Sequence, residues 1–254
     1  MGGKKGLVLG AGGARGLAHL GVLQVLKEEN LEPDIVVGCS AGAIFGALWA
    51  VGLDLYRAER LLVYPGFTRR LFDVSVPKDG LFKGDRFLDV MRLLTKDATF
   101  EQLNIPLAIV ATDLETGDLV VFREGNVAQA VRASISIPGV FKPYRYQDRL
   151  LVDGAVKNRL PVQVAREMGA EKVLAIDVRR GLNNKINTAM DVLLQTIEIL
   201  QEEVFRCNSL DADFLIQPNV SHIGSLQFDT AAEAIRIGRE AAMAQCSEIK
   251  RLME

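Results

Sequence analysis

Two short motifs in the sequence combine residues that can carry out nucleophilic chemistry. The first, residues 38–42, reads Gly-Cys-Ser-Ala-Gly and fits the pattern Gly-x-Ser-x-Gly, in which Ser40 occupies a strained turn between a strand and a helix. The small residues Gly38 and Gly42 let the chain bend and expose the hydroxyl group. The pattern predicts that Ser40 is a nucleophile. Because small residues are common, a plain tight turn in a buried βα unit is the alternative.

The second motif, residues 153–161, begins with Asp153 and Gly154 directly after the apolar run Arg-Leu-Leu-Val. A carboxylate at the end of a strand in an open α/β sheet lies at the edge where ligands bind, so Asp153 is a candidate partner of the serine. An aspartate that merely caps the next helix is the alternative. A carboxylate with a pKa of about 4 is a weak base, and burial among apolar groups can raise the pKa of such a group.

The two histidines are poorly placed for an ordinary catalytic triad. His19 lies within an apolar helical segment, which is typical of a packed histidine, and His222 lies in a late polar segment. The order Ser40, Asp153, His222 does match the triad order of α/β-hydrolases, so a triad through His222 stays open. We favour a pair in which the aspartate takes the serine proton directly.

A glycine-rich segment, residues 10–16, lies between a predicted strand and a predicted helix. Free backbone amides at the start of a helix attract negative charge, so this segment can stabilise an oxyanion or cradle a phosphate. Its spacing departs from Gly-x-Gly-x-x-Gly because Arg15 stands where the third glycine is required, and the lysine of a P-loop is missing. A plain strand-to-helix turn is the third interpretation.

Strand-like and helical segments alternate along the chain and place these motifs at strand ends. Strands are expected at 6–10, 34–38, 106–114, 119–125, 149–156, 172–178 and 213–218, and helices at 14–30, 41–52, 161–169, about 188–206 and from about 229 onward. This alternation predicts an α/β fold with a mostly parallel sheet and helices on both faces. We find no linker, so we expect residues 1–254 to form one domain.

Composition narrows the function classes further. The net charge of −2 argues against a binder of nucleic acid, and 49% hydrophobic residues suffice for a packed core. Three cysteines without close spacing argue against disulfides and against a metal site, so we expect neither a metal nor a cofactor. The uncharged residues 35–53 approach the length of a membrane span, but the turn motif within them favours a strand, a turn and a helix. The apolar run that ends at Gly10 is too short for a secretory signal, so we expect a cytoplasmic protein.

Several segments, taken in order, resemble the patatin-like phospholipase family. They look most similar to its bacterial branch, which is related to the catalytic domain of neuropathy target esterase. The segments are residues 6–23, 38–48, 111–117, 133–143 and 153–161. The resemblance implies a three-layer α/β/α sandwich and a serine hydrolase that acts on phospholipids or lysophospholipids through a Ser–Asp dyad and an acyl-serine intermediate.

The resemblance also implies roles for individual residues. Ser40 would be the nucleophile and Asp153 the base. The glycine-rich segment would be the oxyanion hole, in which Gly12 and Gly13 supply amides and Arg15 steadies the loop or the charge. The supporting motif glycines are Gly10, Gly16, Gly38, Gly42 and Gly154.

Two other functions remain open at this point. An acyltransferase or thioesterase would use the same dyad, because alcohols and water can attack the same acyl-serine. A nucleotide-binding regulatory module would use the glycine-rich segment alone, and it leaves the motifs at Ser40 and Asp153 without a joint explanation.

Ala11 departs from the family, in which many members have glycine, and this is tolerable if the φ angle of Ala11 is negative.

Residues 57–96 are expected to form a mobile cover over the site and the lipid-facing surface. They carry nine Lys and Arg and five Asp and Glu, a net charge of +4, interleaved with Leu71, Phe72, Leu81 and Phe82. Such a segment would give a peripheral contact with the inner face of a membrane, since each basic group can contribute about 1 kcal/mol near an anionic surface. A solvated helical segment is the alternative. The sequence carries no signal for the oligomeric state.

Overall fold

The computed structural model describes residues 3–73, 80–178, 186–207 and 212–253, which form a central sheet of eight strands. Hydrogen-bonded pairing links the strands in the order β5-β6-β3-β2-β1-β7-β8, and β4 pairs with β3 in addition. Pairings among β1, β2, β3, β7 and β8 are parallel, whereas those made by β4, β5 and β6 are antiparallel. The strands are β1 Lys5–Leu9, β2 Ile35–Cys39, β3 Leu107–Asp113, β4 Leu119–Phe122, β5 Tyr144–Tyr146, β6 Arg149–Asp153, β7 Lys172–Ile176 and β8 Phe214–Ile216.

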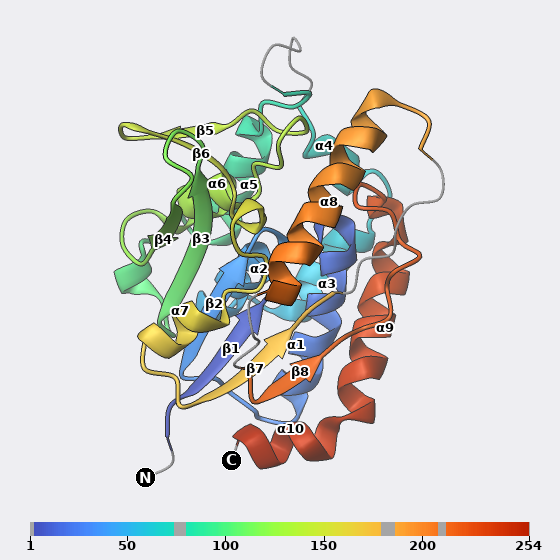
Figure 1. Ribbon diagram of the computed structural model, residues 1–254. Coiled ribbons are helices and arrows are strands. Elements are labelled where there is room, and N and C mark those ends of the chain that lie inside the picture. Colours follow the sequence, from blue (N-terminus) through green and yellow to red (C-terminus); the bar gives the residue numbers. More distant parts are fainter. Residues whose placement is uncertain (1–2, 74–79, 179–185, 208–211, 254) are drawn as a thin grey trace.

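Helices cover both faces of the sheet, with α7 and α8 on one face and α1, α2 and α9 on the other (Figure 1). The α-helices are α1 Ala18–Glu28, α2 Ala41–Ala50, α3 Leu55–Val63, α4 Phe67–Arg70, α5 Asp85–Leu94, α6 Val127–Ser134, α7 Val162–Glu167, α8 Ala189–Cys207, α9 Ala231–Ala244 and α10 Cys246–Met253. Short 3-10 helices are η1 Gly13–Leu17, η2 Phe100–Gln102, η3 Gly154–Val156 and η4 Phe228–Thr230.

Two apolar cores explain why the inner strands are apolar throughout. Side chains of a strand point alternately to its two faces. In β1, Leu7 and Leu9 pack into the core shared with α1, α2 and α9, and Val8 packs into the core shared with α7. Every inner strand must therefore be apolar at consecutive positions, as a sheet covered on both faces requires. The expected three-layer α/β/α architecture is confirmed.

The segment 57–96 contains most of α3 and all of α4 and α5, which agrees with the helical interpretation of this segment. Helices α3 and α5 are amphipathic and turn their polar residues outward. Strand β6 pairs antiparallel with β3, and β5 pairs antiparallel with β6. The sequence did not predict these directions, because apolar patterning carries no information on strand direction. Within the described ranges, no helix combines the length and the apolar character needed to cross a membrane.

Helices α1 and α9 touch backbone to backbone. A Cβ atom at Gly238 would lie 2.0 Å from the carbonyl oxygen of Ala18, and one at Gly21 would lie 2.0 Å from that of Ile235. Both distances are far inside van der Waals contact, so only glycine fits. This contact fixes α9 beside the start of α1, next to the glycine-rich segment.

The variant Gly238→Ala should lower the free energy of unfolding by about 1–3 kcal/mol, because the added methyl group forces the two helices apart. The sign of this change in the free energy of unfolding is diagnostic, because a Gly→Ala change inside an uncrowded helix stabilises the protein by about 0.5–1 kcal/mol. Urea unfolding followed by circular dichroism measures the effect. Gly224→Ala is the control, because its nearest neighbour would lie 3.6 Å away and no loss of stability is expected. A stabilised Gly238→Ala variant would contradict the close packing.

Candidate active site

The ends of two strands bring Ser40 and Asp153 together. The partner of Cys39 on β3 is Val110, and the partner of Asp153 is the next residue, Ala111. Strand β4 occupies the opposite edge of β3 over the same positions, so β2 and β6 must share one edge and meet end to end. Strand β6 ends in Asp153 and β2 is followed directly by Ser40, so a hydroxyl group and a carboxylate lie side by side at this meeting point.

The side chains of Ser40 and Asp153 form a direct hydrogen bond. The serine Oγ donates to the aspartate Oδ2 over 2.6 Å, and each residue is only 3% exposed. The second carboxylate oxygen, Oδ1, accepts the amide of Ala155 over 2.8 Å. The carboxylate is thus held by both oxygens and aimed at the hydroxyl group, which is the geometry expected of a nucleophile and its base.

The backbone of Ser40 has φ 53° and ψ −120°, a conformation that side chains disfavour and that costs on the order of 1–3 kcal/mol. It turns the chain sharply from β2 into α2. The next turn presses against the end of β1, since a Cβ atom at Gly42 would lie 2.0 Å from the carbonyl oxygen of Leu9. The strained turn and the close approach together explain why small residues flank the serine.

A third residue, Ser134 at the end of α6, fixes this turn. Its hydroxyl accepts the amide of Ser40 over 2.8 Å and donates to the carbonyl oxygen of Val110 over 2.7 Å. The turn is therefore tied to β3, the strand that also pairs with Asp153. Sequence analysis missed Ser134 as an individual residue, although it lies within the family-like segment 133–143.

Two glycines of the glycine-rich segment lie at the pocket of the dyad. Gly12 and Gly13 line the small pocket that contains Ser40 and Asp153. The flanking amides of Ala11 and Ala14 donate to Arg159 and Ser225, whereas the structure gives the amides of Gly12 and Gly13 no acceptor among the residues it describes. Gly13 has φ +57° and a Cβ atom there would lie 2.4 Å from a carbonyl oxygen, so glycine is required. Ala11 is not among the residues with a positive φ, so an alanine is tolerated at this position as expected.

Arg15 turns away from the dyad. Its Nε donates to the carbonyl oxygen of Ile223 over 2.7 Å, and its Nη1 lies 3.1 Å from a carboxylate oxygen of Glu198 on α8. It is buried, but it does not line the pocket around Ser40. In this structure its charge ties the glycine-rich segment to α8 and to the chain that precedes α9.

Neither histidine lines a pocket that contains Ser40. His19 is fully buried, and its Nε2 lies 2.8 Å from the carbonyl oxygen of Gly10, at the start of the glycine-rich segment. Burial lowers the pKa of His19 to about 4, so the ring is neutral at physiological pH and donates from Nε2. His222 is exposed and pairs with Glu233 over 3.0 Å.

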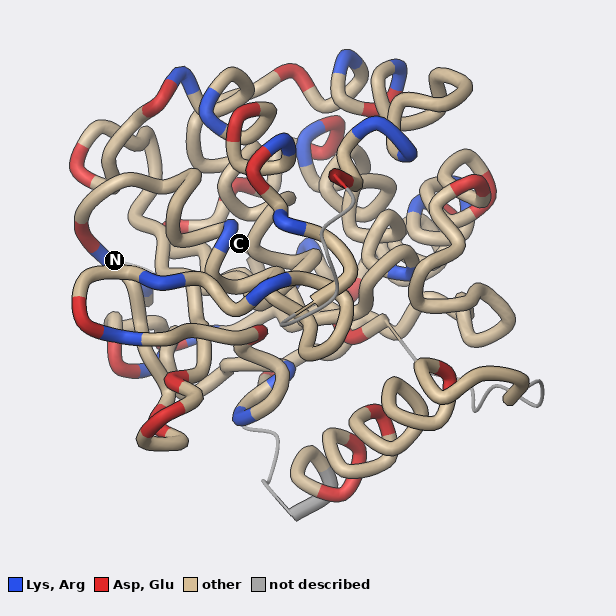
Figure 2. Tube along the Cα trace, turned by 90° about the horizontal axis from the view of Figure 1, so that it is seen from above, with Lys and Arg blue, Asp and Glu red and all other residues tan. Residues whose placement is uncertain are grey.

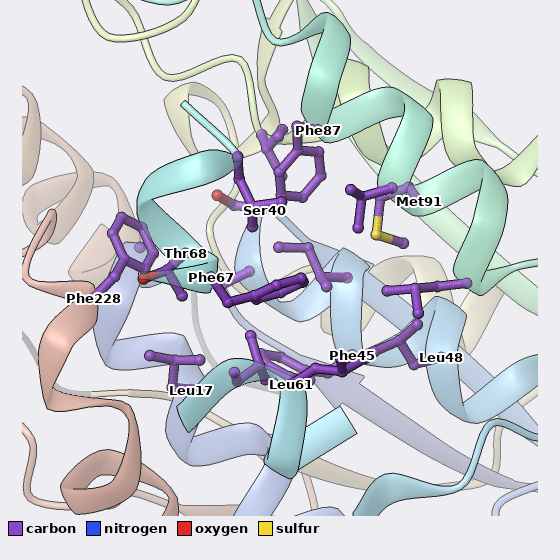
Figure 3. Close-up of a pocket in the computed structure, with 18 of the residues that line it drawn as sticks. Leu17, Ser40, Phe45, Leu48, Leu61, Phe67, Thr68, Phe87, Met91 and Phe228 are labelled. Carbon is purple, nitrogen blue, oxygen red and sulfur yellow. The ribbon is translucent and has the colours of Figure 1, made fainter. Parts of the chain in front are cut away.

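An apolar cavity leads away from Ser40. Figure 3 shows Leu17, Phe45, Leu48, Leu61, Phe67, Phe87, Met91 and Phe228 around the space that also contains the serine. One face of α2 lines it over two turns, with Ala41, Ile44, Phe45 and Leu48. Among its lining residues only Ser40 and Thr68 carry a polar side chain. A cavity of this kind can hold a hydrocarbon chain next to the nucleophile.

Comparison with known proteins identifies the family. A model of the patatin-like phospholipase family matches residues 7–166. The chain belongs to this family. An uncharacterized NTE family protein of Mycobacterium bovis is 34% identical over 269 residues, which cover 94% of this chain and 46% of that protein. Another, from Mycobacterium tuberculosis, is 38% identical over 173 residues, which cover 68% of this chain and 48% of that protein.

The patatin-like fold extends over the described chain. VipD from Legionella pneumophila superposes with a TM-score of 0.71 over 97% of this chain and 67% of that chain, at 17% sequence identity. Structural similarity at such a low sequence identity is evidence for a shared fold only. This patatin-like chain spans about half the length of the curated relatives that it matches.

The structure shows where the apolar residues of segment 57–96 lie. Leu71 and Phe72 line the cavity of this patatin-like domain, and Phe82 packs edge-on against Phe72 with ring centroids 5.0 Å apart. Only Leu81, at 38%, is exposed among the four apolar residues named above. Within the described part of the segment, these apolar residues therefore build the cavity wall more than a lipid-facing surface; residues 74–79 lie outside the description.

The stability of the protein should depend on pH through His19. Below about pH 6.5 the unfolded chain binds a proton that the folded chain binds only below about pH 4, so acidification favours unfolding. The free energy of unfolding should fall by up to about 3 kcal/mol between these values, and His19→Gln should lack this contribution. Urea unfolding of both proteins at pH 7 and pH 4.5 tests this. A wild-type advantage over His19→Gln that does not shrink at pH 4.5 would contradict the buried neutral ring.

Proposed function

We propose that the protein hydrolyses acyl esters of phospholipids or lysophospholipids through an acyl-serine intermediate at Ser40. The observation that carries this proposal is the 2.6 Å hydrogen bond between Ser40 and a buried Asp153, with an apolar cavity beginning at the same serine. Membership of the patatin-like phospholipase family supports lipid acyl chains as substrates.

The first half of the reaction uses groups already in place. The serine Oγ attacks the ester carbonyl carbon while Oδ2 of Asp153 accepts the hydroxyl proton. The carbonyl oxygen becomes an oxyanion, which the amides of Gly12 and Gly13 and the N-terminus of α2 stabilise. Each such donor is typically worth about 3 kcal/mol of the barrier. The intermediate then collapses, and Asp153 passes the proton to the departing alcohol.

The second half repeats these steps with water. The water oxygen attacks the carbonyl carbon of the acyl-serine while Asp153 accepts a proton from the water. This proton passes to the Oγ of Ser40 when the fatty acid leaves. Alcohols or thiols could use the same site, so an acyltransferase or thioesterase differs only in the acceptor. The nucleotide-binding alternative is disfavoured, because Gly12 and Gly13 line the same pocket as the dyad.

The cavity accounts for a preference for lipid. An acyl chain that lies along α2, past Ile44 and Phe45 toward Leu48, leaves water for an apolar wall. Each buried methylene group contributes about 0.8 kcal/mol. This binding energy orients the ester carbonyl at Ser40, which lies at the start of the same helix.

Labelling with a fluorophosphonate probe should modify Ser40 and no other serine. Ser40→Ala should abolish labelling and ester hydrolysis while the fold survives, since the change removes one oxygen atom. Mass spectrometry of the labelled protein identifies the site, and circular dichroism checks folding. Persistent labelling of Ser40→Ala would overturn the assignment of the nucleophile.

The dyad should work without histidine. Asp153→Asn keeps the shape but cannot accept the proton, so kcat for a chromogenic ester should fall by about 10²–10⁴-fold. His222→Ala is the matched control and should retain most activity. The wild-type enzyme should also stay active below the usual histidine pKa of about 6.5. If His222→Ala were as inactive as Ser40→Ala, the serine would act in a triad instead.

A further inference from the structure

Helix α8 covers the pocket that contains the dyad. Leu194, Ile197 and Gln201 line this pocket together with Ser40 and Asp153. In Figure 1 the helix crosses in front of the sheet and rises past the ends of the parallel strands. Since both dyad residues are 3% exposed, α8 separates them from solvent on this side.

Two buried arginines hold the inner face of α8. Arg15 lies 3.1 Å from Glu198, and Arg159 lies 3.3 Å from Glu202. The two glutamates are four residues apart and share one face of the helix. Arg15 comes from the glycine-rich segment and Arg159 from the chain just after Asp153, so α8 is fastened to both halves of the active site.

The opposite face of α8 is exposed and aliphatic. Positions 192, 193, 196, 199, 200, 203 and 204 are exposed, and their helical spacing places them in one stripe. Five of the seven are aliphatic, with exposed fractions between 39% and 60%: Val192, Leu193, Ile199, Leu200 and Val204. We call these five side chains the outer stripe.

Charge indicates what kind of surface the outer stripe meets. Helix α8 carries four acidic residues, Asp191, Glu198, Glu202 and Glu203, and one basic residue, Arg206, at its end. Figure 2 shows the helix at the edge of the molecule with acidic residues along it. Helices that bind anionic membranes carry basic residues beside the apolar face. The charge of α8 is therefore compatible with a neutral surface and opposes an anionic one.

Size and composition argue against a protein partner. Five half-exposed aliphatic side chains offer an apolar area on the order of a few hundred Å², whereas a stable interface buries about 800 Å² on each partner. The outer stripe also lacks the aromatic and arginine side chains that dominate binding between proteins.

We propose that the outer stripe of α8 docks the protein on an electrically neutral lipid surface and so brings the covered dyad to its substrate. The link to catalysis rests on the proposed hydrolase function, but docking itself can be measured without turnover. The apolar face enters the lipid, and the site that α8 covers then lies at the lipid boundary.

Binding is tested with phosphatidylcholine vesicles and the inactive Ser40→Ala protein, which cannot consume the lipid. Adding Leu200→Glu should weaken co-sedimentation by about tenfold or more, because a charge that must stay hydrated replaces an apolar side chain at the interface. Met243→Glu on α9 is the matched control, since Met243 is 58% exposed and Leu200 60%. It should bind like the parent, and circular dichroism should show all three proteins folded.

Three binding results would overturn the proposal. The first is that the parent does not sediment with neutral vesicles, or does so only when anionic lipid is added. The second is that Leu200→Glu and the parent bind equally. The third is a parent dimer in light scattering that Leu200→Glu converts to a monomer, which would make a second copy the occupant of the outer stripe.

Turnover separates this proposal from the proposed function. With Ser40 restored, Leu200→Glu should hydrolyse a soluble short-chain ester at the wild-type rate and lose about tenfold or more on vesicles. Equal loss on both substrates would overturn the docking role. Vesicle binding that depends on Leu200 in a protein without esterase activity would leave docking intact and refute the hydrolase.

Discussion

The structure depends on the end-to-end meeting of β2 and β6 along one edge of β3. Ser40 and Asp153 are 113 residues apart in sequence, yet their strands reach consecutive positions of the same partner strand. The 2.6 Å hydrogen bond between them is therefore a product of sheet register. A slip of one residue in either strand would turn the side chain at its end toward the opposite face.

A polar framework surrounds this meeting point inside an otherwise apolar fold. Ser134 ties the turn at Ser40 to β3, and His19 holds the start of the glycine-rich segment through Gly10. Arg15 and Arg159 reach outward from the same region to α8. Buried charges and a neutral histidine are costly to place in a core unless they are paired. These groups are concentrated near Ser40, which is consistent with a site whose side-chain geometry lowers the stability of the fold.

Much of the fold could be predicted from the sequence, because its signals are local. The strand at Ile35–Cys39, the turn at Ser40 and the helix that follows are encoded by adjacent residues, and the alternation of such units predicts the layers. The direction of β6 could not be predicted in this way, because a short apolar run looks the same in either direction. The pairing of Ser40 with Asp153 was expected from strand ends and from family resemblance, and the structure brings the two side chains together. The supporting role of Ser134 and the destination of the Arg15 guanidinium depend on long-range packing, which periodicity does not encode.

The supports of the glycine-rich segment lie far away in sequence, 208 residues on in the case of Arg15 and Ile223. Ala14 donates to the carbonyl oxygen of Ser225, and Arg15 donates to that of Ile223. During synthesis on the ribosome, Ser40 and Asp153 emerge long before these two acceptors. A nascent chain can thus contain the nucleophile and its base while the loop that would receive the oxyanion still lacks its anchors. Competence for the proposed chemistry is then acquired only after this later segment has been synthesised and has folded against the loop.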